Sequence, residues 1–123
     1  MSGEFEDLLA LGTSYQAMAK DSTNGAKAQN AEWFSTDLTR AGGPQFASKY
    51  RVSVAINAAK ILEITLDSGT TWLKLNGGTA LTADCAYVFD IAVRAADTFN
   101  IRIPDSGGAT VHYCRVDEVF SEA

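Results

Sequence analysis

The sequence predicts an all-β protein, an antiparallel β-sandwich of the jelly-roll kind with an N-terminal arm. Apolar and polar residues alternate along most of the last two thirds of the chain, and turns rich in glycine and aspartate separate the alternating segments. No segment between these turns has the spacing of an amphipathic helix. We therefore expect residues 31–123 to form one sandwich domain, with residues 1–30 as an arm and linker outside it.

The first thirty residues lack this alternation. Phe5, Leu8 and Leu9 lie at helical spacing among acidic residues, which predicts a short helix around them. The tract 19–31 (AKDSTNGAKAQNA) contains small and polar residues with no apolar face, and we interpret it as a linker. The apolar cluster that includes Tyr15 would then serve association with a neighbour and not folding.

Six segments after residue 48 are predicted strands with one buried face, and a further strand is expected within Asn30 to Thr39. In the third of the six, Leu73 is expected to face inward and Trp72 outward. In the last segment, the apolar residues expected to face inward change from odd to even positions after Tyr113. This change predicts a β-bulge near Cys114. The six segments are Lys49 to Asn57, Ile61 to Asp67, Thr71 to Asn76, Tyr87 to Arg94, Thr98 to Ile103 and Thr110 to Val119.

The stretch TWLKLNGGTALT, residues 71–82, contains a glycine pair that is typical of either a phosphate-binding loop or a turn. A phosphate-binding loop needs further glycines or a Gly-Lys-Ser/Thr ending at the start of a helix, and this stretch has neither. Asn76 and Gly77 tolerate the positive φ angles of tight hairpins. We therefore expect a hairpin turn.

Composition and charge exclude several classes of protein. The chain has 123 residues, 46% of them hydrophobic, and a formal net charge of −5. Its basic residues are scattered, so we expect no binding to DNA or RNA, which depends on clustered lysine and arginine. No apolar run is long enough to cross a membrane, and the acidic start MSGEFEDLL is unlike a secretory signal. We expect a protein made in the cytoplasm that has no membrane partner.

The two cysteines, Cys85 and Cys114, are too few for a disulfide scaffold. Free and largely buried thiols are favoured, and a bridge between them remains the alternative. His112 and Cys114 would share one face of a regular strand, yet the further residues of a zinc site or a catalytic pair are missing. We expect no catalytic residue, no cofactor and no metal.

Asp67, Asp97 and Asp105 each follow or precede a predicted strand. At such positions an aspartate commonly bonds the nearby backbone, and calcium coordination is the alternative. Trp72 has three open roles: contact with the arm or another subunit, local packing, and stacking on a ligand.

The run from Leu75 to Arg102, LNGGTALTADCAYVFDIAVRAADTFNIR, resembles the pattern of small jelly-roll proteins in tailed-phage virions. In that pattern an L-T-A-x-x-x-Y-x-F-x-[I/F]-x-V run is followed by a turn and a strand with Phe/Val-Asn. Where a glycine often stands in the turn, this chain has Asp84. The matching positions are Leu81, Tyr87, Phe89, Ile91, Val93, Phe99 and Asn100.

The resemblance implies a capsid decoration (cement) or tail-associated protein of the virion, assembled in the host cytoplasm. Its partners would be other virion proteins and further copies of itself. We therefore expect a non-enzymatic structural protein that binds neighbours through its arm and its sandwich faces. The alternative is a carbohydrate-binding module or tail-fibre adhesin that binds glycan through exposed aromatic residues. The expected partner-contact residues are Phe5, Leu8, Leu9, Tyr15 and Trp72.

Overall fold

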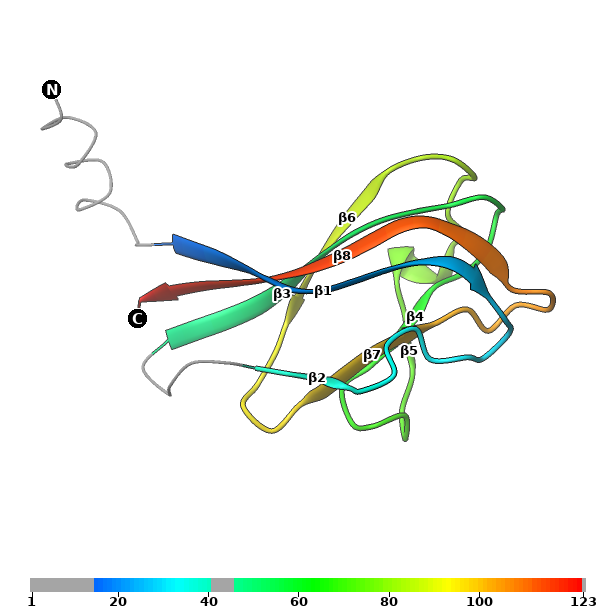
Figure 1. Cartoon of the computed structure of the whole chain (residues 1–123). Helices are drawn as coiled ribbons and strands as arrows, with labels where there is room; N and C mark the ends of the chain where they lie inside the picture. The colour runs from blue at the N-terminus through cyan, green and yellow to red at the C-terminus, as the bar shows by residue number, and fades with distance from the viewer. Residues whose placement is uncertain (1–14, 41–45, 123) are drawn as a thin grey trace, which may run out of the picture.

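Two four-stranded antiparallel sheets pack face to face (Figure 1). The computed structural model describes residues 15–40 and 46–122, and no helix in these residues has the length and apolar character needed to span a bilayer. The first sheet has the strand order β1-β8-β3-β6 and the second β2-β7-β4-β5. All strand pairs in both sheets are antiparallel. The all-β antiparallel sandwich predicted from the sequence is confirmed.

Three long strands extend the first sheet beyond the second. In Figure 1, β1, β3 and β8 run together to the left, where β1 begins and β8 ends. The first sheet contains β1 Tyr15–Lys27, β3 Phe46–Ile56, β6 Tyr87–Ala92 and β8 Ala109–Glu122. The second contains β2 Leu38–Thr39, β4 Glu63–Thr65, β5 Leu73–Lys74 and β7 Thr98–Arg102, and a 3-10 turn, η1, spans Asn76–Gly78.

The core lies between the inward faces of the two sheets. Tyr50, Val52 and Val54 of β3 are fully buried, as are Phe99 and Ile101 of β7, so the buried face predicted for each of these strands is confirmed. The rings of Tyr50 and Phe99 meet edge to face, with centroids 5.2 Å apart and planes at 87°. Because these rings come from different sheets, their contact helps to set how the sheets pack.

The largest correction to the sequence prediction is β1. Residues 15–27, expected in the arm and linker, form a 13-residue strand along β8, from the pair Tyr15 and Ser121 to the pair Lys27 and Ala109. The linker interpretation is therefore wrong for these residues. Two register shifts interrupt the pairing and remove the strict alternation that would have revealed a strand. Residues 1–14, where the short helix was expected, lie outside the described residues.

The strand expected within Asn30 to Thr39 is reduced to the two residues of β2. Ahead of β2, the chain follows the edge of β7, where the Trp33 N–H donates to the Ile101 carbonyl at 2.9 Å. The fully buried Asn100 holds this segment, because its amide accepts from the Phe34 N–H at 3.0 Å and donates to the Phe34 carbonyl at 2.8 Å. Hydrogen bonds to the Asn100 side chain therefore take the place of backbone pairing between strands at Phe34.

The region of the glycine pair differs from the prediction in two respects. Asn76, Gly77 and Gly78 have φ angles of 54°, 63° and 80°, so the expected positive-φ turn is confirmed. However, the turn does not close a hairpin, because β5 before it belongs to the second sheet and β6 after it to the first. Leu73, expected to face inward, is 51% exposed on the short edge strand β5.

The bulge predicted in the last strand is confirmed. The register of β8 against β3 shifts between the partners of Ala55 and Ile56, which leaves His112 as the extra residue. Val111 and Cys114 are buried, and the two residues between them are exposed. His112 and Cys114 therefore do not share a face, contrary to the expectation for a regular strand.

Two glycines with positive φ provide a stability prediction. A Cβ at Gly77 would have open space around it, whereas a Cβ at Gly108 would overlap the Lys27 carbonyl oxygen. Gly77→Ala should lower the free energy of unfolding by about 1 kcal/mol, through backbone strain alone. Gly108→Ala should cost a further ~1–3 kcal/mol, because the Lys27 backbone must move. Urea denaturation measures both, and equal losses would contradict the packing at Gly108.

Candidate functional site

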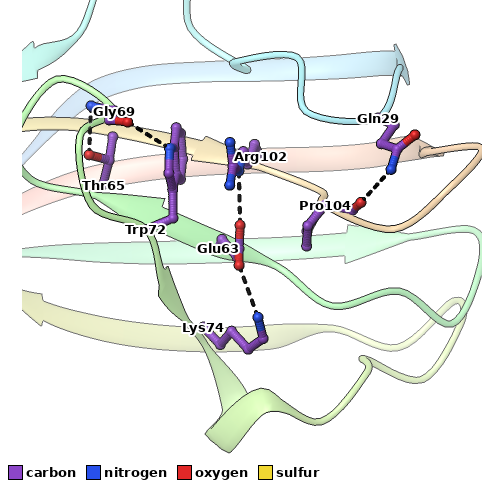
Figure 2. Close-up of polar contacts among 8 residues, drawn as sticks. All are labelled: Gln29, Glu63, Thr65, Gly69, Trp72, Lys74, Arg102 and Pro104. Atoms are coloured by element: carbon purple, nitrogen blue, oxygen red, sulfur yellow. Dashed lines mark hydrogen bonds and ion pairs between the residues drawn. The ribbon is translucent and has the colours of Figure 1, made fainter.

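The outer face of the second sheet carries a group of interacting polar and aromatic side chains (Figure 2). Since Ile101 faces the core, its neighbour Arg102 on β7 faces outward. The Arg102 guanidinium donates from Nε to Oε1 of Glu63 at 2.8 Å and lies over the Trp72 ring, 4.1 Å from its centroid. Lys74 donates to the other Glu63 oxygen at 3.1 Å. One carboxylate thus joins three adjacent strands, β7, β4 and β5.

The turn between β4 and β5 fixes the position of Trp72. The Asp67 carboxylate accepts from the Thr71 N–H at 2.8 Å and from the Thr65 hydroxyl at 2.9 Å. The Trp72 Nε1–H donates to the Gly69 carbonyl at 3.0 Å. The backbone bond from Thr71, with the Thr65 hydroxyl, holds the pKa of Asp67 below its usual value. The predicted role of Asp67, bonding its own turn, is confirmed.

Glu63 is a buried acid held in its charged form. Burial by itself would raise the pKa of this carboxyl, but the hydrogen bonds and charges of Arg102 and Lys74 outweigh burial and lower it. Its side chain is only 7% exposed. Asp90, on the outer face of the first sheet, also binds two cations but is 38% exposed. The pKa of Asp90 is lowered as well, chiefly by the hydrogen bond from Arg51.

The expected contact residues are not brought together in the described part of the chain. Trp72 is half-buried, and of its three open roles the structure shows local packing. The Arg102 guanidinium occupies one face of its ring, so a sugar could stack only on the other face. Tyr15 begins β1, in the other sheet, opposite Ser121. The remaining three, Phe5, Leu8 and Leu9, lie outside the described residues.

The two cysteines differ in burial, and the histidine is bonded to an aspartate. Neither Cys85 nor Cys114 is in a disulfide, so the favoured prediction of free thiols is confirmed, although Cys85 is exposed and not buried. Burial raises the pKa of Cys114 to about 12, which keeps its thiol protonated at neutral pH. His112 bonds from Nε2 to Asp84 Oδ1 at 2.6 Å on the exposed side of β8.

The aspartates at the ends of strands accept hydrogen bonds from backbone N–H groups. Across residues 15–40 and 46–122, no three His, Cys, Asp or Glu side chains are grouped to hold a metal ion. Asp97 accepts from the Arg94 N–H of its own turn at 2.8 Å. Asp105 instead accepts from the Ile61 N–H of a neighbouring loop at 2.8 Å. These bonds explain why aspartates occur at strand ends, in turns and loops.

A cleft of about 570 Å³ lies at the end of the sandwich opposite the start of β1, and we call it the end cleft. The turn after β1, the loop after β3 and the turn before β8 form its walls. Lys27 donates from Nζ to the Thr23 hydroxyl at 2.6 Å, and Lys60 donates to the Ser106 carbonyl at 2.8 Å. The end cleft has no signal in the sequence, because only the paired strands bring these two lysines to one end.

Large apolar side chains are exposed on four strands of the described chain. Val88 of β6 and Tyr113 of β8 flank β3 on the outer face of the first sheet, opposite Ser53 and Ala55 respectively. The other two lie on edge strands, and exposed apolar residues that stand singly are common on folded proteins. The four are Met18, Leu73, Val88 and Tyr113.

Comparison with known proteins gives a likeness of fold. No family model matches the chain, and no curated protein matches it. Among solved structures, it is similar to a chain of the structure described as "Bacillus endospore appendages form a novel family of disulfide-linked pili", with a TM-score of 0.50 and 11% sequence identity. The alignment covers 91% of this chain and 92% of that chain. The expected kinship with phage virion proteins stays a prediction.

Glu63 provides a prediction about pH. Because its pKa is lower in the folded chain than in the unfolded chain, its interactions stabilise the fold above the unfolded pKa, about 4.3. This stabilisation is lost as the pH falls through the folded pKa. Glu63→Gln should lower the free energy of unfolding by about 1–3 kcal/mol at pH 7. The difference from the wild type should shrink steadily below pH ~4, as measured by urea denaturation.

Asp90→Asn is the matched control for this prediction. Asp90 also binds two cations, Lys49 and Arg51, but it is partly exposed to solvent. Its loss should therefore cost about 1 kcal/mol or less at pH 7. Equal losses for the two variants, or a Glu63→Gln loss that is the same at pH 3 and pH 7, would contradict the account of Glu63.

The cysteines provide a prediction about reactivity. In the folded protein one thiol, Cys85, should react rapidly with a thiol reagent, and Cys114 should react only after unfolding. Absorbance of the released reagent measures the two phases. Cys85→Ser should remove the rapid phase, and Cys114→Ser should leave it intact. Two rapid phases in the native protein would show that Cys114 is not protected.

Proposed function

We propose that this chain is a non-enzymatic structural subunit of a multi-subunit assembly, joined to its neighbours by residues 1–14 and by its sheet faces. The observation that carries the proposal is the extension of β1, β3 and β8 beyond the second sheet (Figure 1). β1 begins at the far end of this extension, away from the body of the core.

The apolar side chains of that segment need a surface to cover them. Burying Phe5, Leu8 and Leu9 would contribute about 5–9 kcal/mol before ordering costs are subtracted. That amount supports contacts repeated many times in a polymer more readily than an isolated pair in dilute solution. Val88 and Tyr113 offer further apolar area on the outer face of the first sheet.

The bonding of the polar side chains supports a structural role. Glu63, Asp67 and Asp97 are bound to backbone groups or to cations of their own chain, and the Cys114 thiol is buried. Catalytic groups are commonly placed in a cleft with a perturbed pKa and a free face toward substrate. The pKa values of Glu63, Asp67 and Cys114 are also shifted, but the shifts come from burial and from bonds within the same chain.

The finer proposal is that the assembly is a tailed-phage virion, with this chain as a decoration or tail-associated protein assembled in the host cytoplasm. The pattern between Leu75 and Arg102 supports it, since Leu81, Ile91 and Phe99 of that pattern are buried. The fold likeness to a chain of a structure described as pili supports a polymer in general. Glycan binding is not proposed, because Arg102 covers one face of the Trp72 ring.

Removing residues 1–14 tests the proposal. The full chain should form multimers, and the shortened chain should remain folded but associate at least tenfold more weakly, which corresponds to a loss of about 1.4 kcal/mol. Mass photometry and light scattering measure association. Far-UV circular dichroism and thermal melting establish that the fold persists, since β1 starts at Tyr15.

β1 corrects the expectation that residues 1–30 lie outside the sandwich. A deletion to residue 30 removes the edge strand and should unfold the chain or expose β8. A full chain that stays monomeric at every concentration, or a shortened chain that assembles equally well, would overturn the role of residues 1–14.

A further inference from the structure

We propose that the end cleft binds the acidic N-terminal segment, residues 2–9 (SGEFEDLL), of a second copy of this chain. The inference rests on the proposed function, which requires a surface for residues 1–14 without identifying one. The end cleft matches this segment in charge, in lining and in position.

The charge of the end cleft is its first distinguishing feature. Seven of the ten lysine and arginine side chains lie 3.3 Å or less from a carboxylate oxygen of their own chain. Lys27 and Lys60 instead bind uncharged oxygens, the Thr23 hydroxyl and the Ser106 carbonyl. Both ammonium groups can therefore donate to an incoming carboxylate, in a stronger, charge-assisted hydrogen bond.

The nearby acids do not neutralise these lysines through any contact in the described residues. Asp105, on the turn that provides the acceptor of Lys60, is bonded to the Ile61 N–H. The two lysines make the end cleft positively charged, although the protein as a whole has a net charge of −5. An acidic partner segment is the complementary ligand.

The lining of the end cleft leaves room for apolar side chains. Apart from the lysines and two polar residues, its walls are made of alanine and glycine: Ala26, Ala28, Ala58, Gly107, Gly108 and Ala109. A volume of about 570 Å³ falls within the range of small binding pockets. The segment SGEFEDLL intersperses three acids with Phe5, Leu8 and Leu9, so carboxylates can bind the lysines while apolar side chains cover the small residues.

The position of the end cleft favours a bound segment from another copy. β1 runs from Tyr15 to Lys27, and at about 3.3 Å per residue its ends lie roughly 40 Å apart. Asp7 and Glu6 precede Tyr15 by eight and nine residues. A fully extended chain of that length spans at most ~29–32 Å, so these carboxylates fall short of the end cleft of their own chain. Glu4 could span roughly 40 Å only in a fully extended chain, which would leave Leu8 and Leu9 outside the end cleft.

A contact from one end of a subunit to the opposite end of the next is heterologous. The acidic segment and the end cleft are different surfaces, so each bound subunit still presents one free segment and one free cleft. Repetition of this contact closes a ring or extends an open filament, depending on the rotation between subunits. The inference thus gives the assembly a polarity that the proposed function alone does not specify.

Charge reversal on the full chain tests the inference. The cleft variant is Lys27→Glu with Lys60→Glu, and the segment variant is Glu6→Lys with Asp7→Lys. Each alone should self-associate at least tenfold more weakly than the wild type by mass photometry, because like charges then meet. Mixing the two variants should restore assembly, since each cleft then finds a segment of opposite charge. A merely structural role of the lysines would give no such recovery.

The control is Arg94→Glu, compared with Lys60→Glu alone, because it changes the net charge equally at the exposed turn between β6 and β7. It should assemble nearly as well as the wild type. If the double cleft variant fails to fold by circular dichroism, Lys60→Glu alone replaces it. A folded cleft variant that assembles normally, or a mixture that shows no recovery, would overturn the inference. The proposed function would still stand if removal of residues 1–14 abolished assembly.

Discussion

The sandwich depends on the hydrogen bonding of β8. This 14-residue strand pairs with β1 on one side and with β3 on the other. Its backbone N–H and carbonyl groups therefore provide hydrogen-bond partners for both neighbouring strands. The bulge at His112 keeps Val111 and Cys114 on the inward face, and without the extra residue one of the two would turn outward. Glu118 of β8 is fully buried and bonded to Lys20 of β1 at 3.2 Å. A buried charge needs such a partner, so β1 is an integral part of the fold.

The sequence predicts the strands that have one apolar face and one polar face. β3, β6, β7 and β8 were found at nearly their observed bounds, because their buried side chains alternate. β1 was missed because it is an edge strand whose inward positions include Lys20, Thr23 and Lys27, and because two register shifts break its period. Leu73 was placed wrongly because β5 has only two residues, too few for alternation to fix which face is buried.

The surface features were harder to predict than the core, because they depend on contacts between distant segments. Nothing in the spacing of Trp72 and Arg102 indicates that the guanidinium would lie over the ring. Asn100 was singled out only as part of a pattern, yet its amide holds the chain ahead of β2 against β7. The end cleft has the same character, because Lys27 and Lys60 have no sequence pattern in common and only the turns of the sandwich bring them together.

The distribution of charge bears on how copies of this chain would meet. Three acids stand at positions 4, 6 and 7, ahead of β1 in the sequence, and the two lysines of the end cleft lie near the far end of β1, roughly 40 Å from its start. At physiological ionic strength, exposed charges interact over about 8 Å, so only surfaces in near contact attract or repel strongly. Two copies side by side would oppose surfaces of like net charge, whereas two copies end to end would oppose acids and lysines. Electrostatics would therefore favour end-to-end encounters before any apolar contact forms, and the apolar side chains beside the acids would then determine how long the contact lasts.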